Sequence, residues 1–235
     1  MLIKMRIKKS NVDNLVLAGL LIAAALVVFN QVQLSQISSS IAMPKMSAGS
    51  AKVSGIDVSE SSSTAMSLAL VFPELKNAET EAEIAAILLP SGTPDYSAAL
   101  GGISFDDPIN SLDYLSQWYS RINEEVKKND PLVWQRYLNL AAAPRGISCE
   151  YCCGVGPQGI DSQGNSRCGC QHNPALLAIT LGLMKYTDYD DAQVLREVMR
   201  WKTLFFPQNM VSLGVEVAGK DVSQLAGLPG MVGGC

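Results

Sequence analysis

The chain has 235 residues, of which 48% are hydrophobic and 17% are charged. This composition provides enough apolar residues for a buried core and excludes a wholly disordered chain. The formal net charge of −4 leaves no basic surface of the kind that phosphate backbones select, so we expect no nucleic-acid partner.

The N-terminus combines positive charge with an apolar segment. An uninterrupted apolar run over 15–29 is preceded by four basic residues, Lys4, Arg6, Lys8 and Lys9. Positive charge next to an apolar segment is retained on the cytoplasmic side of a membrane. The pattern therefore predicts a cytoplasmic basic N-terminus over 1–11, a single transmembrane anchor over 12–34, and an extracytoplasmic remainder.

A cleaved signal peptide has the same charge pattern and is the main alternative to an anchor. Small-residue cleavage sites normally follow the apolar region closely, whereas polar residues follow it here and the nearest such site ends at Ala42. We therefore expect an uncleaved signal-anchor and a location in the cell membrane, with the main domain outside the cytoplasm.

Residues 35–67 are rich in Ser, Ala, Gly and Met, with SSS at 38–40 and again at 61–63. Such a segment cannot bury enough apolar area to offset the entropy lost on ordering. The composition predicts a flexible or partly helical stalk between the anchor and a domain over 68–235.

From Leu68 on, helical patterns are separated by prolines. The spacing predicts one helix over 78–89 and two more that start at Asp107-Pro108 and Asp130-Pro131. A short strand is expected at 103–105, among turn-forming residues.

Two further helices are expected beyond the cysteines. Asn173-Pro174 is typical of a helix start and predicts a helix over 175–186, while the aspartates at 188–191 cap a second helix that ends at Pro207. Helices joined by so few residues pack as an antiparallel hairpin. The Gly- and Val-rich tail is expected to add a strand around 211–217. The predicted class is mainly α: an irregular helical domain with a cysteine-rich knuckle and a C-terminal helical hairpin.

Five of the six cysteines and the only histidine fall between positions 149 and 172. Cys149 and Cys152 have the spacing with which a tight turn presents two sulfurs to one ion. Cys168, Cys170 and His172 alternate, so in an extended segment their side chains point to one side. These five residues are the predicted metal ligands.

Sulfur-rich ligation with one imidazole suits zinc first, and copper(I) or an iron–sulfur centre after it. Four or more protein ligands would close the site and make it structural. Adjacent side chains diverge, so we expect Cys153 to stay outside the site and to form a disulfide with Cys235. That bond would contribute ~4 kcal/mol in the chain-entropy model.

Two other uses of the cysteines remain open. Three disulfides would use all six cysteines without a metal, and oxidants outside the cytoplasm favour them. Alternatively, Cys149 and Cys152 would form the redox-active dithiol of a membrane-tethered thiol oxidoreductase, or the cluster would handle copper. A thioredoxin-like dithiol, however, needs a preceding strand and a helix start, which this context lacks.

The Cys-Gly-Cys core at 168–170, with His172 and a helical hairpin after it, resembles extracytoplasmic proteins of bacteria and archaea named for a Pro-Cys-Tyr-Cys-Gly-Cys motif. The resemblance covers about residues 149–207. Here the motif is split, with Tyr151-Cys152-Cys153 before a loop and Cys168-Gly-Cys170 after it. The resemblance implies an extracytoplasmic location and a bound metal, and it implies no reaction.

The sequence thus predicts a membrane-anchored, zinc-binding protein with its domain outside the cytoplasm. We expect it to act as a binding or assembly component with a protein partner in the membrane or envelope, rather than as an enzyme. A disulfide-stapled interaction domain without metal is the nearest alternative.

Overall fold

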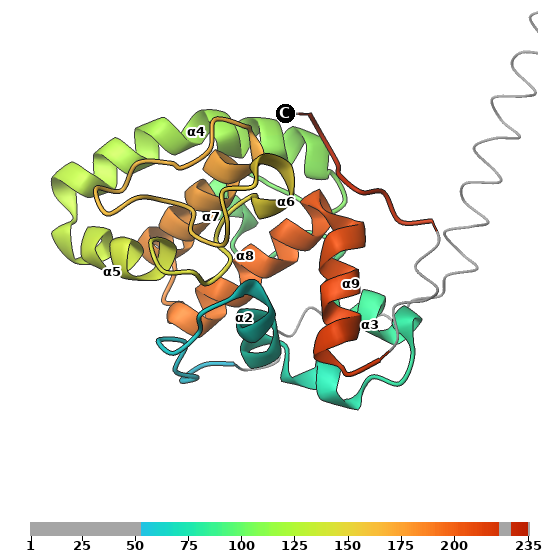
Figure 1. Cartoon of the computed structure of the whole chain (residues 1–235). Helices are drawn as coiled ribbons and strands as arrows, with labels where there is room; N and C mark the ends of the chain where they lie inside the picture. Colours follow the sequence, from blue (N-terminus) through green and yellow to red (C-terminus); the bar gives the residue numbers. More distant parts are fainter. Residues whose placement is uncertain (1–52, 221–226, 235) are drawn as a thin grey trace, which may run out of the picture. The chain divides into compact units, whose positions relative to one another are not determined.

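The computed structural model describes residues 53–220 and 227–234, shown in colour in Figure 1. They belong to one of two structural units of the chain, Ala48–Cys235. The other unit, Met1–Ser47, contains the predicted anchor over 12–34 and lies outside the described residues. None of the described helices has the length and hydrophobicity of a membrane span.

The described part of the chain is helical, which confirms the predicted mainly α class for this region. It contains eight α-helices and no strand, only an isolated bridge between Ile160 and Ser166. The α-helices are α2 Thr64–Val71, α3 Glu81–Leu88, α4 Pro108–Asn129, α5 Pro131–Ala141, α6 Glu150–Cys153, α7 His172–Tyr186, α8 Asp191–Phe205 and α9 Pro207–Val217. Two 3-10 helices, η1 Pro73–Asn77 and η2 Ser97–Leu100, lie between them.

Most helices begin where capping residues predict. Asp107 and Asp130 each accept a hydrogen bond from an amide of the first turn and precede a proline, which starts α4 and α5 respectively. Thr80 and Asp190 start α3 and α8 with capping boxes, in which two orphan amides are satisfied reciprocally.

Two predicted strands are wrong. Residues 103–105 are irregular, because the Phe105 amide donates to the Gly92 carbonyl within a loop instead of pairing in a ladder. Residues 211–217 belong to α9, which has a proline at its first position. The buried residues of α9 recur at helical spacing and include Met210, Val211, Gly214 and Val215.

Residues 53–67, which the composition assigned to the stalk, are part of the folded unit. Val53 is buried in the core, and the Ser67 hydroxyl donates to the Arg145 carbonyl at 2.8 Å. The small polar side chains of this segment serve as caps and buried hydrogen-bond partners, which composition alone does not distinguish from a linker. The remainder of the predicted stalk, 35–52, lies outside the described residues.

Helix α7 is the central element, with 12 of its 15 residues buried. It packs chiefly along α4 and also contacts α5 and α8, the next helix of the predicted hairpin (Figure 1). Gly182 permits the close approach to α4, because a Cβ there would lie 3.1 Å from the Trp118 ring. The first turn of α7 carries the residues that organise the cysteine cluster.

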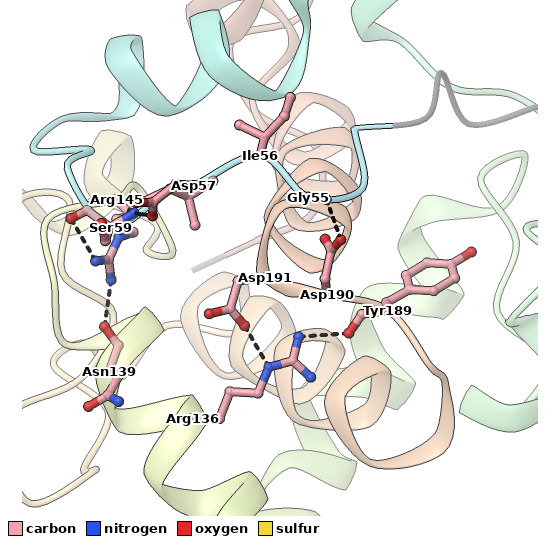
Figure 2. A pocket seen from close by; sticks show the side chains of 11 residues that line it. Gly55, Ile56, Asp57, Ser59, Arg136, Asn139, Arg145, Tyr189, Asp190 and Asp191 are labelled. Carbon is pink, nitrogen blue, oxygen red and sulfur yellow. Dashed lines mark hydrogen bonds and ion pairs between the residues drawn. The ribbon is translucent and has the colours of Figure 1, made fainter.

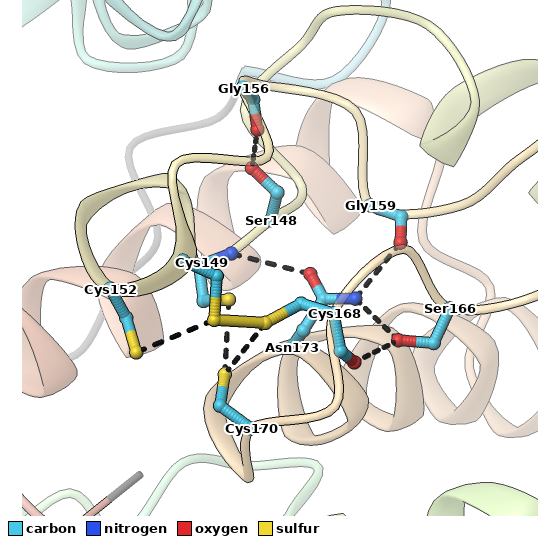
Figure 3. The surroundings of a disulfide bond; sticks show 10 residues. Ser148, Cys149, Cys152, Gly156, Gly159, Ser166, Cys168, Cys170 and Asn173 are labelled. Carbon is cyan, nitrogen blue, oxygen red and sulfur yellow. Dashed lines mark hydrogen bonds between the residues drawn. A yellow bond between two sulfur atoms is a disulfide. The ribbon is translucent and has the colours of Figure 1, made fainter.

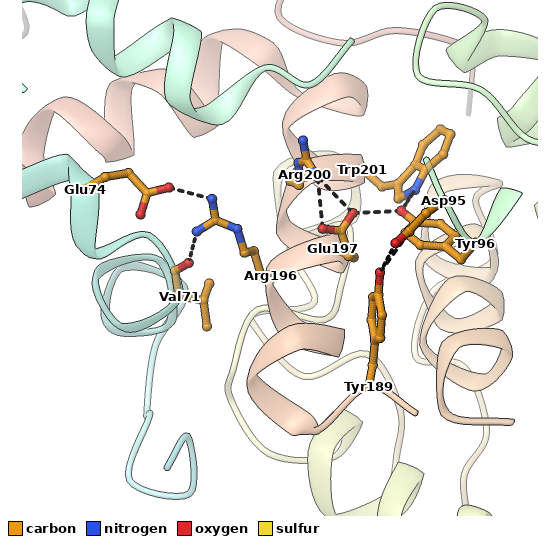
Figure 4. A network of polar contacts seen from close by, with 9 residues as sticks. All are labelled: Val71, Glu74, Asp95, Tyr96, Tyr189, Arg196, Glu197, Arg200 and Trp201. Atoms are coloured by element: carbon orange, nitrogen blue, oxygen red, sulfur yellow. Dashed lines mark hydrogen bonds and ion pairs between the residues drawn. The ribbon is translucent and has the colours of Figure 1, made fainter. Parts of the chain in front are cut away.

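Helix α8 supplies buried polar side chains that hold the N-terminal segments in place (Figure 4). Glu197 accepts a hydrogen bond of 2.9 Å from the Tyr96 hydroxyl, which in turn accepts one of 3.0 Å from Trp201 Nε1. Arg196 donates to a carboxylate oxygen of Glu74 at 2.5 Å. These contacts connect η1 and the segment before η2 to α8.

Candidate metal centre

The cysteines of the cluster come from two segments, one on each side of the loop 154–167. In the first, Cys149 precedes the single-turn helix α6, which ends at Gly154 in the left-handed conformation, with φ 65°. In the second, Cys168 and Cys170 lie in an irregular stretch that leads directly into α7. Figure 3 shows the two segments facing each other across the sulfur atoms.

The Asn173 side chain joins these two segments (Figure 3). Its Oδ1 accepts a hydrogen bond of 3.3 Å from the Cys149 amide. Its Nδ2 donates to the Gly159 carbonyl at 2.9 Å and to Ser166 Oγ at 2.7 Å. The Ser166 hydroxyl itself donates to the Cys168 carbonyl at 2.8 Å. One buried amide on α7 therefore sets the relative position of both cysteine segments.

The role of Asn173 differs from the predicted helix cap. Helix α7 begins at His172, three residues before the predicted start at 175, and has no side-chain cap. Asn173 is fully buried, and its amide is used across the loop rather than at the helix end. Asparagine caps helices and also serves as a buried amide with several hydrogen-bond partners. The sequence pattern therefore does not separate the two roles.

Four cysteine sulfurs converge at this point. The Sγ atoms of Cys149, Cys153, Cys168 and Cys170 all lie within 4.8 Å of one another. Cys170 Sγ is 3.1 Å from Cys149 Sγ and 3.4 Å from Cys168 Sγ. Tetrahedral zinc, with Zn–S bonds of about 2.3 Å, holds its sulfurs about 3.8 Å apart. The four cysteines are therefore close enough to hold a metal ion.

Two sulfurs of this four-sulfur group are joined to each other. Cys153 and Cys168 form a disulfide, whereas Cys149 and Cys170 are free, buried thiols. This pairing contradicts the predicted disulfide between Cys153 and Cys235, because Cys153 is bonded within the cluster. Cys235 lies outside the described residues.

The helical turn at α6 decides which of the adjacent cysteines joins the group. Residues four apart in a helix lie on one face, so Cys153 follows Cys149 to the cluster. The sequence interpretation assumed a knuckle turn and assigned Cys152 to this position. Cys152 lies instead with Cys170 and His172 in a second group, whose ligand atoms are also within 4.8 Å of one another. The four-residue spacing with a following glycine was the signal for the helical turn.

His172 is fully buried and lies outside the four-sulfur group. Its ring contacts those of Phe205 and Phe206, with centroids 5.5 Å and 4.8 Å away. Its Nε2 lies 2.8 Å from the Val232 carbonyl, which can only accept, so Nε2 carries the hydrogen. Its Nδ1 is buried and has no hydrogen-bond partner among the described residues. This arrangement leaves Nδ1 as the atom that could bind a metal, because ligating histidines commonly donate their other ring N–H to a carbonyl.

A buried lysine, Lys202, lies beside Glu150 at the start of α6. Lys202 Nζ is fully buried and donates to the Gly146 carbonyl at 2.9 Å and to the Glu150 carboxylate at 2.6 Å. Burial lowers the pKa of Lys202, and the Glu150 carboxylate opposes that effect. The charge of Lys202 favours the thiolate form of Cys149.

The contact between the two free thiols shifts their pKa values in opposite directions. The contact with Cys149 lowers the pKa of Cys170 to about 4, although burial acts in the opposite direction. The same contact and burial raise the pKa of Cys149. Of the two free thiols, Cys170 therefore loses its proton more readily, and the thiolate is the form that binds metals.

A separate polar pocket of about 620 Å³ lies between residues 55–59, α5 and the start of α8 (Figure 2). Its arginines are used by the protein itself. Arg136 pairs with Asp191 at 2.5 Å, and Arg145 donates to the Val58 carbonyl at 2.8 Å. The first contact joins α5 to α8 and the second fastens residues 55–59 to the helical unit, which explains the charged lining without a ligand.

Comparison with known proteins adds no functional assignment. No family model matches the chain, and neither the curated protein sequences nor the solved structures contain a match to it. The functional argument therefore depends on the geometry of the cysteine cluster.

Proposed function

We propose that the protein binds one zinc ion through Cys149, Cys153, Cys168 and Cys170 in their reduced form. The observation that carries this proposal is the convergence of four sulfurs, from both sides of the loop, within 4.8 Å of one another. In the reduced chain the bonded pair becomes two thiols, and four thiolates are a common ligand set of structural zinc.

A structural role suits this ligand set better than a catalytic one. Four protein ligands fill the tetrahedral positions of zinc and leave none for water or substrate. Three of the four cysteines are buried, namely Cys149, Cys168 and Cys170. The ion would join α6 to the segment that leads into α7, and thereby close the loop 154–167. Copper(I) and an iron–sulfur centre are the other ions or clusters that accept sulfur ligands.

We also propose that this domain is held outside the cytoplasm by the apolar segment over 12–34. Support comes from the basic residues before that segment and from the resemblance to extracytoplasmic proteins with a Pro-Cys-Tyr-Cys-Gly-Cys motif. In that location the zinc-bound domain would serve as a binding or assembly component with a protein partner in the envelope.

A disulfide-stapled domain is the second candidate function. The Cys153–Cys168 bond favours it, because an oxidising compartment preserves such bonds. In that case the cluster would stabilise the loop without any ion, and the protein would be an interaction domain of the same location.

Metal analysis and thiol counting separate the two candidates. The full chain is purified under reducing conditions without chelator, and its zinc content and its reactive thiols are measured before and after denaturation. Zinc binding predicts one ion per chain and four thiols that react only after the ion is removed. Stapling predicts no metal and a Cys153–Cys168 bond that re-forms as soon as the reductant is withdrawn.

A further inference from the structure

The sulfur atoms of the four-sulfur group can form a disulfide or bind a metal ion, but the same atoms cannot do both at once. Zinc binds cysteine as a thiolate, and a sulfur in a disulfide is no longer a thiolate. Cys153 and Cys168 are bonded to each other, while Cys149 and Cys170 remain thiols at the same point. The chain therefore either carries this bond or holds a metal with all four sulfurs, and the same site allows both.

We propose that the centre is a redox switch that exchanges a bound zinc ion for the Cys153–Cys168 disulfide. This inference rests on the proposed zinc site and adds its regulation by a class of oxidant, the peroxides. Oxidation would release the ion and leave a stapled loop, and reduction would restore the zinc-bound form. Both candidate functions of the previous section would then be states of one protein.

The oxidation step balances without any redox change at zinc. The Cys153 thiolate attacks one oxygen of the peroxide, which breaks the O–O bond and yields a sulfenic acid and hydroxide. The Cys168 thiolate then attacks the sulfenic sulfur, forms the S–S bond and expels a second hydroxide. Two protons from solvent convert the hydroxides into water. The two sulfurs lose two electrons, the peroxide gains them, and the ion leaves as Zn²⁺.

Exposure selects the sulfur that reacts first. Cys153 is the exposed member of the group, at the end of α6 before Gly154, whereas the other three cysteines are buried. Thiolate oxidation follows accessibility, so a peroxide reaches Cys153 first. Cys168 is its partner in the structure and is therefore the resolving residue.

The surrounding scaffold supports both states. Asn173 binds the Cys149 amide, the Gly159 carbonyl and the Ser166 hydroxyl, and none of these bonds uses a sulfur. The two cysteine segments therefore stay in place whether the sulfurs are bonded to each other or to an ion. Return to the reduced form needs only two electrons from a thiol or phosphine.

The test is a peroxide titration of the full chain. The protein is reduced with a phosphine, loaded with zinc, freed of excess ion, and titrated with hydrogen peroxide beside a chromogenic zinc indicator. We expect one zinc released for each Cys153–Cys168 bond that peptide maps count, and recovered zinc binding after reduction. Zinc that stays bound after the Cys153 and Cys168 thiols are lost, or a bond between another pair of the four sulfurs, would overturn the switch.

Two matched variants locate the reaction. Cys149→Ser and Cys153→Ser each remove one ligand, but only Cys153→Ser removes the exposed sulfur. We expect Cys149→Ser to keep forming the Cys153–Cys168 bond with peroxide, and Cys153→Ser to lose the Cys168 thiol about tenfold more slowly, because the remaining cysteines of the four-sulfur group are buried. Equal rates of Cys168 thiol loss would overturn the order of reaction. The titration of the unaltered chain tests the switch even if neither variant folds.

Failure of the switch and failure of the zinc site give different results. Reduced protein that binds no zinc contradicts the proposed function, and the switch falls with it. Reduced protein that binds one zinc and keeps it during oxidation contradicts the switch alone.

Discussion

Asn173 Oδ1 accepts a hydrogen bond of 3.3 Å from the backbone amide of Cys149, 24 residues earlier in the chain. This bond connects the first turn of the central helix α7 to the first cysteine of the cluster. The Nδ2 of the same side chain holds the Gly159 carbonyl and the Ser166 hydroxyl (Figure 3). The geometry of the four-sulfur group thus depends on a side chain that is itself no ligand.

Replacing Asn173 by alanine should weaken both the fold and the metal site. The buried Cys149 amide would lose its partner, which costs roughly 1–3 kcal/mol of unfolding free energy. Residues that orient ligands typically change metal affinity by about tenfold or more, and we expect a loss of this size in competition with a chelator. Asn165→Ala is the matched control, because its amide binds Asp161 on the exposed loop. Equal zinc affinities of the two variants would contradict the role of Asn173.

Replacing Gly159 by alanine should disrupt the same frame by a different route. An added Cβ would overlap the Ile147 carbonyl oxygen and lie 2.8 Å from Leu177 Cδ2. Such crowding in a packed region costs roughly 1–3 kcal/mol or more, so the midpoint of urea unfolding should fall. Gly169→Ala places its Cβ in open space although it stands between two cysteines. It should unfold and bind zinc like the unaltered chain, and a comparable defect there would refute the packing argument.

The helix starts could be predicted from the sequence because each depends on a few neighbouring residues. Asp107 and Asp130 cap their helices ahead of prolines, and these contacts are local. The conformation of residues 211–217 depends instead on contacts with residues far away in the sequence. Gly214 faces Leu88 so closely that a Cβ there would lie 2.5 Å from Leu88 Cδ1, and this packing of α9 on α3 overrides the β preference of its valines.

The candidate site could be located from the sequence, but its ligands could not all be identified. The clustering of five cysteines between positions 149 and 172 can be read directly from the sequence. The choice between Cys152 and Cys153 depends on whether residues 149–153 form a knuckle or a helical turn. A helix as short as α6 has no hydrophobic periodicity, so the spacing of Cys149 and Cys153 with the following Gly154 is its only signal in the sequence, and its conformation follows from the contacts around it.

Replacing Lys202 by methionine should destabilise the chain through its unpaired carboxylate. Lys202 is fully buried, and its Glu150 partner has a side-chain exposure of 15%. Removal of one member of such a pair costs roughly 3 kcal/mol, because the remaining charge stays desolvated. The double variant Lys202→Met with Glu150→Gln should recover part of that loss, and chemical denaturation of the four proteins measures the coupling. A double variant no more stable than Lys202→Met would contradict the pairing.

Replacing Tyr96 by phenylalanine should change how stability depends on alkaline pH. Burial and the neighbouring Glu197 raise the pKa of Tyr96 above its usual value of 10.0. The native state thus keeps a proton that the unfolded state loses, so this contribution to stability is complete below pH 10 and is lost as pH rises above it.

The Tyr96→Phe variant should cost roughly 1–3 kcal/mol at pH 7, because Trp201 Nε1 loses its acceptor and Glu197 loses a donor. Above pH 10 its unfolding free energy should fall less steeply than that of the unaltered chain. Denaturant titrations at a series of pH values measure both effects, with Tyr114→Phe as the exposed control. Parallel pH curves for all three proteins would contradict the role of the buried hydroxyl.

X-ray absorption at the zinc edge of the reduced, zinc-loaded chain tests the central claim most directly, because it counts the atoms bound to the ion. Four thiolates predict a first shell of four sulfurs at about 2.3 Å, with no nitrogen or oxygen neighbour. A shell of three sulfurs and one nitrogen would assign His172 in place of one cysteine. Such a shell would contradict the four-sulfur site. A shell of mainly oxygen and nitrogen would contradict it as well, and so would a reduced chain that retains no zinc.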